Sequence, residues 1–200
     1  MQRAVPRLIL ASQSTFRAGL LAAAGVSAEA MPAHVDEAAI KAAAKGMSAQ
    51  DTALLLASLK AERIARRFPD ALVIAGDQIL VCEGRWFDKP RDLDAARAQL
   101  RDLRGRGHEL VTAVLCQRGE QRIWQHVAQP RLMMRDFSDA FLEAYLALEG
   151  EVLTTTVGAY RVEGPGMQLF DSVEGEHTAI MGLPLLPLLG FLRQHGVLIP

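Results

Sequence analysis

The chain has 200 residues, half of them hydrophobic, and a formal net charge of −1 at pH 7. This length suits one domain, or one domain with a lobe, whose core needs neither disulfides nor a structural metal. The near-neutral charge argues against whole-protein attraction to nucleic acid or anionic membranes, so any anion site must be a local cluster of cations. Cys82 and Cys116 are not spaced as CxxC, and no apolar run approaches the roughly 20 residues that span a bilayer. We therefore expect a soluble cytoplasmic protein that binds neither nucleic acid nor membrane.

Local patterns predict alternating strands and helices along the chain. The expected strands cover residues 7–12, 30–34, 72–75, 79–82 paired with 86–87, 108–116, 122–134 and 154–162. The expected helices cover residues 14–24, 48–68, 92–103, 138–148 and 184–195. This alternation predicts an α/β fold with a mixed central sheet flanked by helices, as a single domain over residues 1–200.

The stretch LILASQSTFRAGLL places an arginine where a helix is just beginning. The first turn of a helix carries partial positive charge, so an acid would be favoured there rather than Arg17. The conflict disappears if an anion sits at the helix start, where backbone N–H groups, the hydroxyls of Ser12 and Ser14, and Arg17 would converge on a phosphate. The alternative is a solvent-facing arginine on an ordinary helix.

Two lysines offer further positive charge. Lys60 lies at the edge of the apolar face of its predicted helix, which fits either a phosphate-binding cation or a lysine whose stem covers the core while its ammonium reaches water. Lys89 sits in the turn Asp88-Lys89-Pro90, where the proline restricts the backbone.

Acidic residues follow two of the predicted strands. Asp77 ends the run LVIAGD and could be a general base for water, a metal ligand or a turn residue. Asp36 and Glu37 offer hard oxygen ligands or form a solvated acidic loop. The sequence contains no phosphate-binding GxxxxGK[ST] loop, no zinc spacing and no GxSxG nucleophile elbow. Cations and carboxylates without such a nucleophile favour metal-assisted hydrolysis of a phosphoanhydride.

Nine short segments in order carry a resemblance to one family over about 180 residues. They are LILASQSTFRAGLL, VDEA, LASLKA, VIAGDQIL, DKPRDLDAA, LRGRGHELVTAV, FSDAFLEAY, VGAYRVEGPG and IMGLPLLPL. The sequence resembles the Maf (septum-formation-inhibitor-like) nucleotide pyrophosphatases. The resemblance implies an α/β sheet with a cleft between two lobes.

The resemblance also implies hydrolysis of a nucleoside triphosphate to the monophosphate and pyrophosphate with a divalent cation, Mg²⁺ or Mn²⁺. Asp77 matches the general base of the family. The substrate phosphates would contact Ser12, Ser14, Arg17, Lys60 and Lys89. The metal would bind Glu37 and Asp77.

Three positions match the branch that resembles 7-methyl-GTP pyrophosphatases: Phe16, Gln78 and Glu163. A carboxylate at Glu163 could accept hydrogen bonds from guanine, and a positively charged methylated ring gains from stacking on Phe16. The alternative is the branch that prefers dTTP and UTP. The sequence also departs from the family where Thr15 and Ala18 replace the usual proline and second arginine, and where Asp88 replaces a glycine.

Two rival functions stay open at this point. The protein could bind a nucleotide and regulate septum formation through a partner without needing turnover, or it could be an α/β domain whose site has decayed. The expected ligand of either the enzyme or the regulator is a small-molecule nucleotide. A homodimer is left open.

Overall fold

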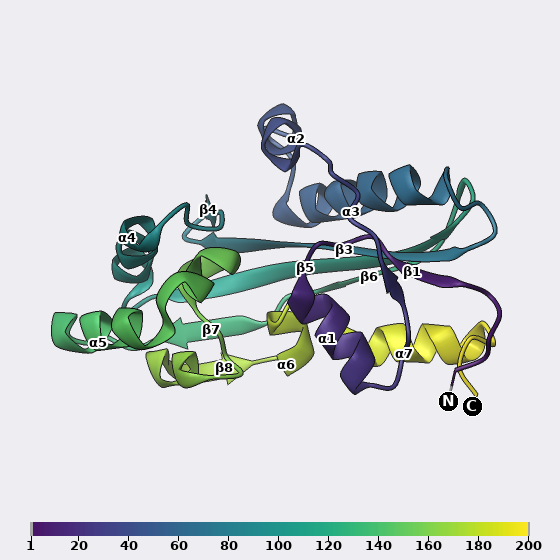
Figure 1. Cartoon of the computed structure of the whole chain (residues 1–200). Helices are drawn as coiled ribbons and strands as arrows, with labels where there is room; N and C mark the ends of the chain where they lie inside the picture. Colours follow the sequence, from purple (N-terminus) through teal and green to yellow (C-terminus); the bar gives the residue numbers. More distant parts are fainter. Residues whose placement is uncertain (1, 200) are drawn as a thin grey trace. The chain divides into compact units, whose positions relative to one another are not determined.

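A computed structural model describes residues 2–199, which form two compact units (Figure 1). Unit 1 contains the chain up to Asp77, Thr112–Ala128, and the chain from Gly182 onward. Unit 2 contains Gln78–Val111 and Gln129–Met181. Each unit therefore combines segments that are far apart in the sequence, and the passage from unit 1 to unit 2 at residues 77 and 78 falls within a strand.

The described residues form an eight-stranded sheet, with hydrogen-bonded order β2-β1-β3-β5-β7-β8; β4 pairs with β3, and β6 pairs with β5. The strands are β1 (Leu8–Leu10), β2 (Glu29–Ala30), β3 (Leu72–Cys82), β4 (Arg85–Phe87), β5 (Gly107–Arg118), β6 (Gln121–Ala128), β7 (Arg131–Met134) and β8 (Phe170–Glu174). Strand β1 is parallel to β2 and β3. The pairs β3–β4, β5–β6, β5–β7 and β7–β8 are antiparallel. The predicted α/β class with a mixed central sheet is thus confirmed.

The long predicted helices are all present, and four of them begin with a capping side chain. The helices are α1 (Thr15–Ala23), α2 (Glu37–Ala43), α3 (Ala49–Ala65), α4 (Leu93–Leu103), α5 (Asp139–Glu149), α6 (His177–Ile180) and α7 (Leu185–Gln194), with 3₁₀ turns η1 (Gly150–Thr155), η2 (Val157–Ala159) and η3 (Pro165–Leu169). The side chains of Ser14, Ser48, Asp92 and Ser138 each accept a backbone N–H in the first turn of a helix. Such caps satisfy donors that have no partner within the helix. Among residues 2–199, no helix combines the length and the apolar character that crossing a membrane would demand.

In unit 1, α3 lies on one face of the strands, and α1 and α7 lie on the opposite face (Figure 1). The buried face of α3 supplies Ala57, Ala61 and Ile64 to a core that also contains Ile9 and Val73 from the sheet. Small residues on this face let the helix pack close to the strands. Since the polar residue Lys60 shares the buried part of α3, its ammonium group must find partners inside the unit.

In unit 2, α4 and α5 pack against each other and against η1. The core there combines apolar side chains of these helices, such as Leu100 and Leu142, with Leu80 from β3 and Leu132 from β7. Tyr160 belongs to the same core and packs edge-on against Phe170 of β8.

Two strand predictions had the wrong boundaries. The predicted strands 72–75 and 79–82 form one continuous strand, β3, so Asp77 lies inside a strand rather than after its end. The predicted strand 122–134 is divided into β6 and β7 around Pro130, which has no N–H to donate to a ladder. Strand β5 pairs with both pieces, using different parts of its length.

Two further predictions were wrong in type. The segment 30–34 is a strand only at its first residue, because Pro32 cannot donate and His34 adopts a φ of 48°. The segment 154–162 forms 3₁₀ turns in place of a strand. There the hydroxyl of Thr154 bonds back to the carbonyl of Glu151, and Gly158 adopts a φ of 81°. The helices α2 and α6 and the strand β8 were not anticipated.

Candidate active site

The start of α1 forms a polar turn in unit 1. Ser14 caps the helix by accepting the backbone N–H of Arg17 at 3.3 Å, and the backbone N–H of Ser14 donates to Ser12 Oγ at 3.1 Å. Ser12 is buried, although it is a polar residue. The serines that the sequence singled out therefore do meet at one place, where they order the chain between β1 and α1.

The side chain of Arg17 is held by neutral acceptors. Its Nε donates to the carbonyl of Gly182 at 2.7 Å, and its Nη1 donates to Ser12 Oγ at 3.2 Å. Burial lowers the pKa of this guanidinium, whereas the charges of Asp77 and Glu37 act in the opposite direction. Arg17 is therefore the cation of a cluster that contains carboxylates, which explains how the protein tolerates it at the start of a helix.

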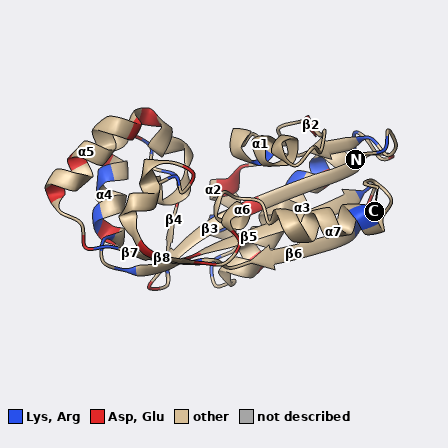
Figure 2. Ribbon diagram, turned by 90° about the horizontal axis from the view of Figure 1, so that it is seen from below, with Lys and Arg blue, Asp and Glu red and all other residues tan. Residues whose placement is uncertain are grey.

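Lys60 joins two carboxylates within unit 1. Its Nζ lies 2.5 Å from Asp77 Oδ1 and 2.7 Å from Glu37 Oε1. The side chains of Lys60 and Asp77 are 9% and 5% exposed, but that of Glu37 is 49% exposed, so the cluster reaches the surface at Glu37. Figure 2 shows the acidic start of α2 beside α3. Burial alone would raise the pKa of Glu37, but the charge and hydrogen bond of Lys60 outweigh it and lower the pKa.

Asp77 presents a buried oxygen with no protein partner. Its Oδ2 makes no hydrogen bond in the described structure, while its Oδ1 accepts from Lys60. Such a buried acceptor is costly unless water, an ion or a ligand contacts it. The neighbouring Gly76 has no room for a side chain, since a Cβ there would lie 2.9 Å from the carbonyl oxygen of Ala113 and 3.7 Å from Arg17 Nε. The strand thus passes the cluster at a point where only glycine fits.

Among the described residues, Asp77 and Glu37 fit a divalent cation whose remaining ligands are not protein side chains. Asp77 and Glu37 both face the ammonium of Lys60, and both offer the carboxylate oxygens that Mg²⁺ and Mn²⁺ prefer. Residues 2–199 contain no group of three or more His, Cys, Asp or Glu side chains placed to hold a metal. A cation would therefore need water or substrate oxygens beside these two carboxylates, as is common for Mg²⁺.

The remaining predicted site residues belong to different places. Phe16 is a partly buried residue of α1 in unit 1. Gln78, Lys89 and Glu163 belong to unit 2, where Lys89 and Glu163 are exposed. The amide of Gln78 donates to the carbonyls of Ala179 and Ile180, at 3.0 and 3.1 Å. The structure thus gathers Ser12, Ser14, Arg17, Glu37, Lys60 and Asp77 in unit 1, and the roles of all the predicted site residues stay predictions.

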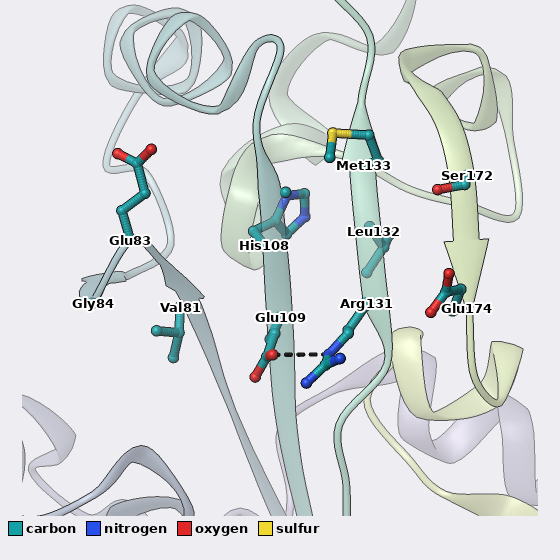
Figure 3. Close-up of a pocket in the computed structure, with 11 residues that line it drawn as sticks. Val81, Glu83, Gly84, His108, Glu109, Arg131, Leu132, Met133, Ser172 and Glu174 are labelled. Carbon is teal, nitrogen blue, oxygen red and sulfur yellow. Dashed lines mark hydrogen bonds and ion pairs between the residues drawn. The ribbon is translucent and has the colours of Figure 1, made fainter.

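Unit 2 also contains a pocket of about 620 Å³ that the sequence did not suggest (Figure 3). Strands β3, β5, β7 and β8 line it with Val81, Glu109, Arg131, Met133 and Glu174, among others. Glu109 and Arg131 form an ion pair of 3.0 Å across it, drawn as the dashed line in Figure 3. No residue predicted for the site lines this pocket. The sequence gives no local signal for this pocket, because its lining residues come from four strands and are brought together only by strand pairing.

The fold and the cluster define an α/β protein in which buried cations and carboxylates meet beside one strand of a mixed sheet. The chain belongs to the family described as Maf-like proteins, whose sequence model matches residues 7–195.

Several curated relatives cover almost the whole chain. A protein of Granulibacter bethesdensis named nucleoside triphosphate pyrophosphatase is 59% identical over 194 residues, which are 96% of this chain and 98% of that relative. A protein of Rhodospirillum rubrum with the same name is 52% identical over 201 residues and 100% of both chains. A protein of Rhizobium meliloti named 7-methyl-GTP pyrophosphatase is 46% identical over 195 residues, 96% of this chain and 98% of that one.

Proposed function

We propose that the protein hydrolyses a nucleoside triphosphate to the monophosphate and pyrophosphate. The observation that carries this proposal is the cluster of Asp77, Lys60, Glu37 and Arg17, in which Asp77 keeps an unbonded buried oxygen beside two cations. The names of the Granulibacter and Rhodospirillum relatives support the same reaction. Attack of water on a phosphoanhydride needs an acceptor for a water proton and positive charge for the departing phosphate, and this cluster contains both.

Each residue of the cluster has a separate role in this proposal. Asp77 Oδ2 accepts a hydrogen bond from the attacking water and then its proton. Arg17 and Lys60 bind the phosphate oxygens and stabilise the charge that accumulates on pyrophosphate, and Lys89 stays a predicted phosphate-binding cation. The Ser12 and Ser14 hydroxyls and the N–H groups at the start of α1 offer further donors to phosphate. A divalent cation at Glu37 and Asp77 would neutralise phosphate charge and make phosphorus more electrophilic.

We further propose 7-methyl-GTP as the preferred substrate. Phe16, Gln78 and Glu163 match the branch that resembles 7-methyl-GTP pyrophosphatases, and the name of the Rhizobium relative supports this choice. Glu163 would accept hydrogen bonds from the guanine edge, and Phe16 would stack on the positively charged ring. The two donors of the Gln78 amide already bind backbone carbonyls, so Gln78 would act by holding the chain at α6.

A nucleotide panel tests both levels of the proposal. Purified protein is incubated with 7-methyl-GTP, GTP, dTTP, UTP and ATP in the presence of Mg²⁺ or Mn²⁺, and pyrophosphate release is followed. We expect release from 7-methyl-GTP at the highest kcat/KM. Turnover of dTTP or UTP without turnover of 7-methyl-GTP would contradict the substrate, and no release from any nucleotide would contradict the reaction. Cytoplasmic location, absence of nucleic-acid binding and the oligomeric state stay predictions from the sequence.

A further inference from the structure

An ion pair in unit 2 joins the end of α5 to the segment after η2. Arg161 Nε lies 2.7 Å from Glu149 Oε2, and Arg161 Nη2 lies 3.0 Å from Glu149 Oε1, so the two groups form a bidentate pair. The Glu149 side chain is only 4% exposed, and that of Arg161 is 26% exposed. A bidentate pair with one buried partner fixes the orientation of both side chains more strongly than a surface pair does.

The loop that carries Glu163 is built against this pair. A Cβ on Gly166 would lie 2.4 Å from the carbonyl oxygen and 2.8 Å from the backbone nitrogen of Arg161. A Cβ on Gly164 would lie 3.6 Å from Arg161 Nη2 and 3.9 Å from Glu149 Oε1. Gly166 therefore packs on the backbone of Arg161, whereas Gly164 packs on the ion pair itself. The residue directly after Glu163 thus rests on the Arg161 guanidinium and the Glu149 carboxylate.

The negative charge of a second acid also acts on Arg161. The pKa of Arg161 is raised first by its hydrogen bonds to Glu149, and the negative charges of Glu149 and Glu163 raise it further. Glu149 is buried and holds the Nε–Nη2 edge of the guanidinium, whereas Glu163 is exposed and has no role in the pair. The guanidinium thus provides a fixed positive charge two residues before an accessible carboxylate.

A buried hydroxyl completes this arrangement. Tyr145 Oη has no hydrogen-bond partner in the described structure, and it would lie 2.9 Å from a Cβ on Gly166. Burial raises the pKa of this phenol, and the negative charge of Glu149 adds to the effect. Tyr145 therefore stays neutral and limits the space behind the loop.

We propose that Arg161, held by Glu149, is a positioning residue that fixes the loop carrying Glu163 and thereby the choice of base. The inference rests on the proposed function, because it gives Glu163 the task of recognising the base. It adds two residues that act through Glu163 without touching the nucleotide. Base selection should then depend on Arg161 and Glu149 even though neither is needed for attack on the phosphate.

The test compares selectivity in wild type, Arg161→Met, Arg161→Lys, Glu149→Gln and Glu163→Gln. For each we measure kcat and KM for 7-methyl-GTP and UTP, and calorimetric Kd values for both nucleotides in EDTA. We expect Arg161→Met to lower the ratio of kcat/KM for 7-methyl-GTP over that for UTP by about tenfold. The loss should arise from a higher KM for 7-methyl-GTP, while kcat for UTP stays unchanged. Arg161→Lys should restore part of the ratio, since it keeps the charge but not the planar fork.

The matched control is Arg97→Met. Arg97 forms a bidentate pair with Glu143 between α4 and α5, with the same distances of 2.7 and 3.0 Å, and neither residue belongs to the Glu163 loop. A merely structural role for Arg161 would change thermal stability without changing selectivity, as the control should. If Arg161→Met does not fold, Arg161→Lys and Glu149→Gln carry the same test.

The two proposals fail in different ways. The positioning role would be overturned, and the reaction left intact, if Arg161→Met and Glu149→Gln kept wild-type selectivity while Glu163→Gln lost it. A wild-type protein that releases no pyrophosphate but prefers 7-methyl-GTP in calorimetry, with the preference lost in Arg161→Met, would overturn the reaction and support the positioning role. Equal Kd values for the two nucleotides in wild type would overturn the positioning role.

Discussion

The ammonium of Lys60, on a helix, lies 2.5 Å from Oδ1 of Asp77, a strand residue 17 positions further along the chain, and both side chains are buried in unit 1. The same ammonium contacts Glu37 at 2.7 Å, so one cation is shared between two acids. Burial of a carboxylate is costly unless a charge or hydrogen bonds compensate it. Lys60 therefore acts as the internal counterion that lets the protein keep a carboxylate inside a strand.

Asp77→Asn tests the acceptor role of the carboxylate. The amide keeps the shape of the side chain but cannot take a proton from water, so we expect kcat to fall by about 10²-fold or more. Nucleotide Kd should change far less, because the cations remain. The measurement is pyrophosphate release, with calorimetric binding on the same preparations. Asp70→Asn, at an exposed turn, is the control. Unchanged turnover in Asp77→Asn would exclude this residue as the base.

Lys60→Met tests the counterion. The variant leaves Asp77 buried without its partner, and removal of one member of a buried ion pair lowers the free energy of unfolding by about 3 kcal/mol. The same change should strengthen Mn²⁺ binding, because Asp77 and Glu37 no longer share an internal cation. Urea unfolding and Mn²⁺ titration by electron paramagnetic resonance measure the two effects. Lys45→Met, at an exposed position, should change neither. A variant as stable as wild type with unaltered Mn²⁺ affinity would contradict the counterion role.

Local signals in the sequence were sufficient for the capped helices. Ser14, Ser48, Asp92 and Ser138 are the first residues of predicted helices, and each caps its helix in the structure, because capping depends on residues within one turn. The same locality explains the failure at residues 154–162. That segment has the composition of a strand, but it forms 3₁₀ turns where Gly158 packs against Leu80 and Tyr160, which the local sequence does not encode.

Residues of the buried cluster could be singled out from the sequence, but the pairs that they form could not. The placement of Lys60 at the edge of the apolar face of a helix fitted either a phosphate-binding cation or a lysine whose ammonium reaches water, whereas the structure buries the ammonium between two carboxylates. Its partners came from α2, which was not predicted, and from the middle of β3. Arg17 likewise suggested a bound anion at the start of its helix, and only the fold shows that the negative charges of Asp77 and Glu37 also act on it. Strand pairing and helix packing decide which charged side chains meet, and residue spacing within one segment does not reveal this.

Gly76→Ala tests the tight passage of β3 beside the cluster. The new methyl group would lie 2.9 Å from the backbone carbonyl oxygen of Ala113, which cannot move without disturbing β5. We expect a loss of about 1–3 kcal/mol in the free energy of unfolding and a fall in activity as Asp77 is displaced. Gly19→Ala is the matched control, since nothing lies within 4 Å of its new methyl group. In the middle of α1, alanine should stabilise the protein by about 0.5–1 kcal/mol. Equal effects of the two substitutions would argue against the steric explanation.

His108 makes the stability of the protein depend on pH. Burial lowers its pKa from 6.5 to about 4, and its Nε2 lies 2.8 Å from the hydroxyl of Tyr160. The unfolded chain therefore binds a proton more readily than the folded one between these two values. The contribution of His108 is complete above pH 6.5 and is lost as the pH falls toward 4, by about 3 kcal/mol. Urea unfolding measured from pH 7.5 to 4 checks this, with His108→Gln as the comparison. The variant should show a shallower loss of stability over this range, and parallel curves for the two proteins would mean that other groups dominate the acid sensitivity.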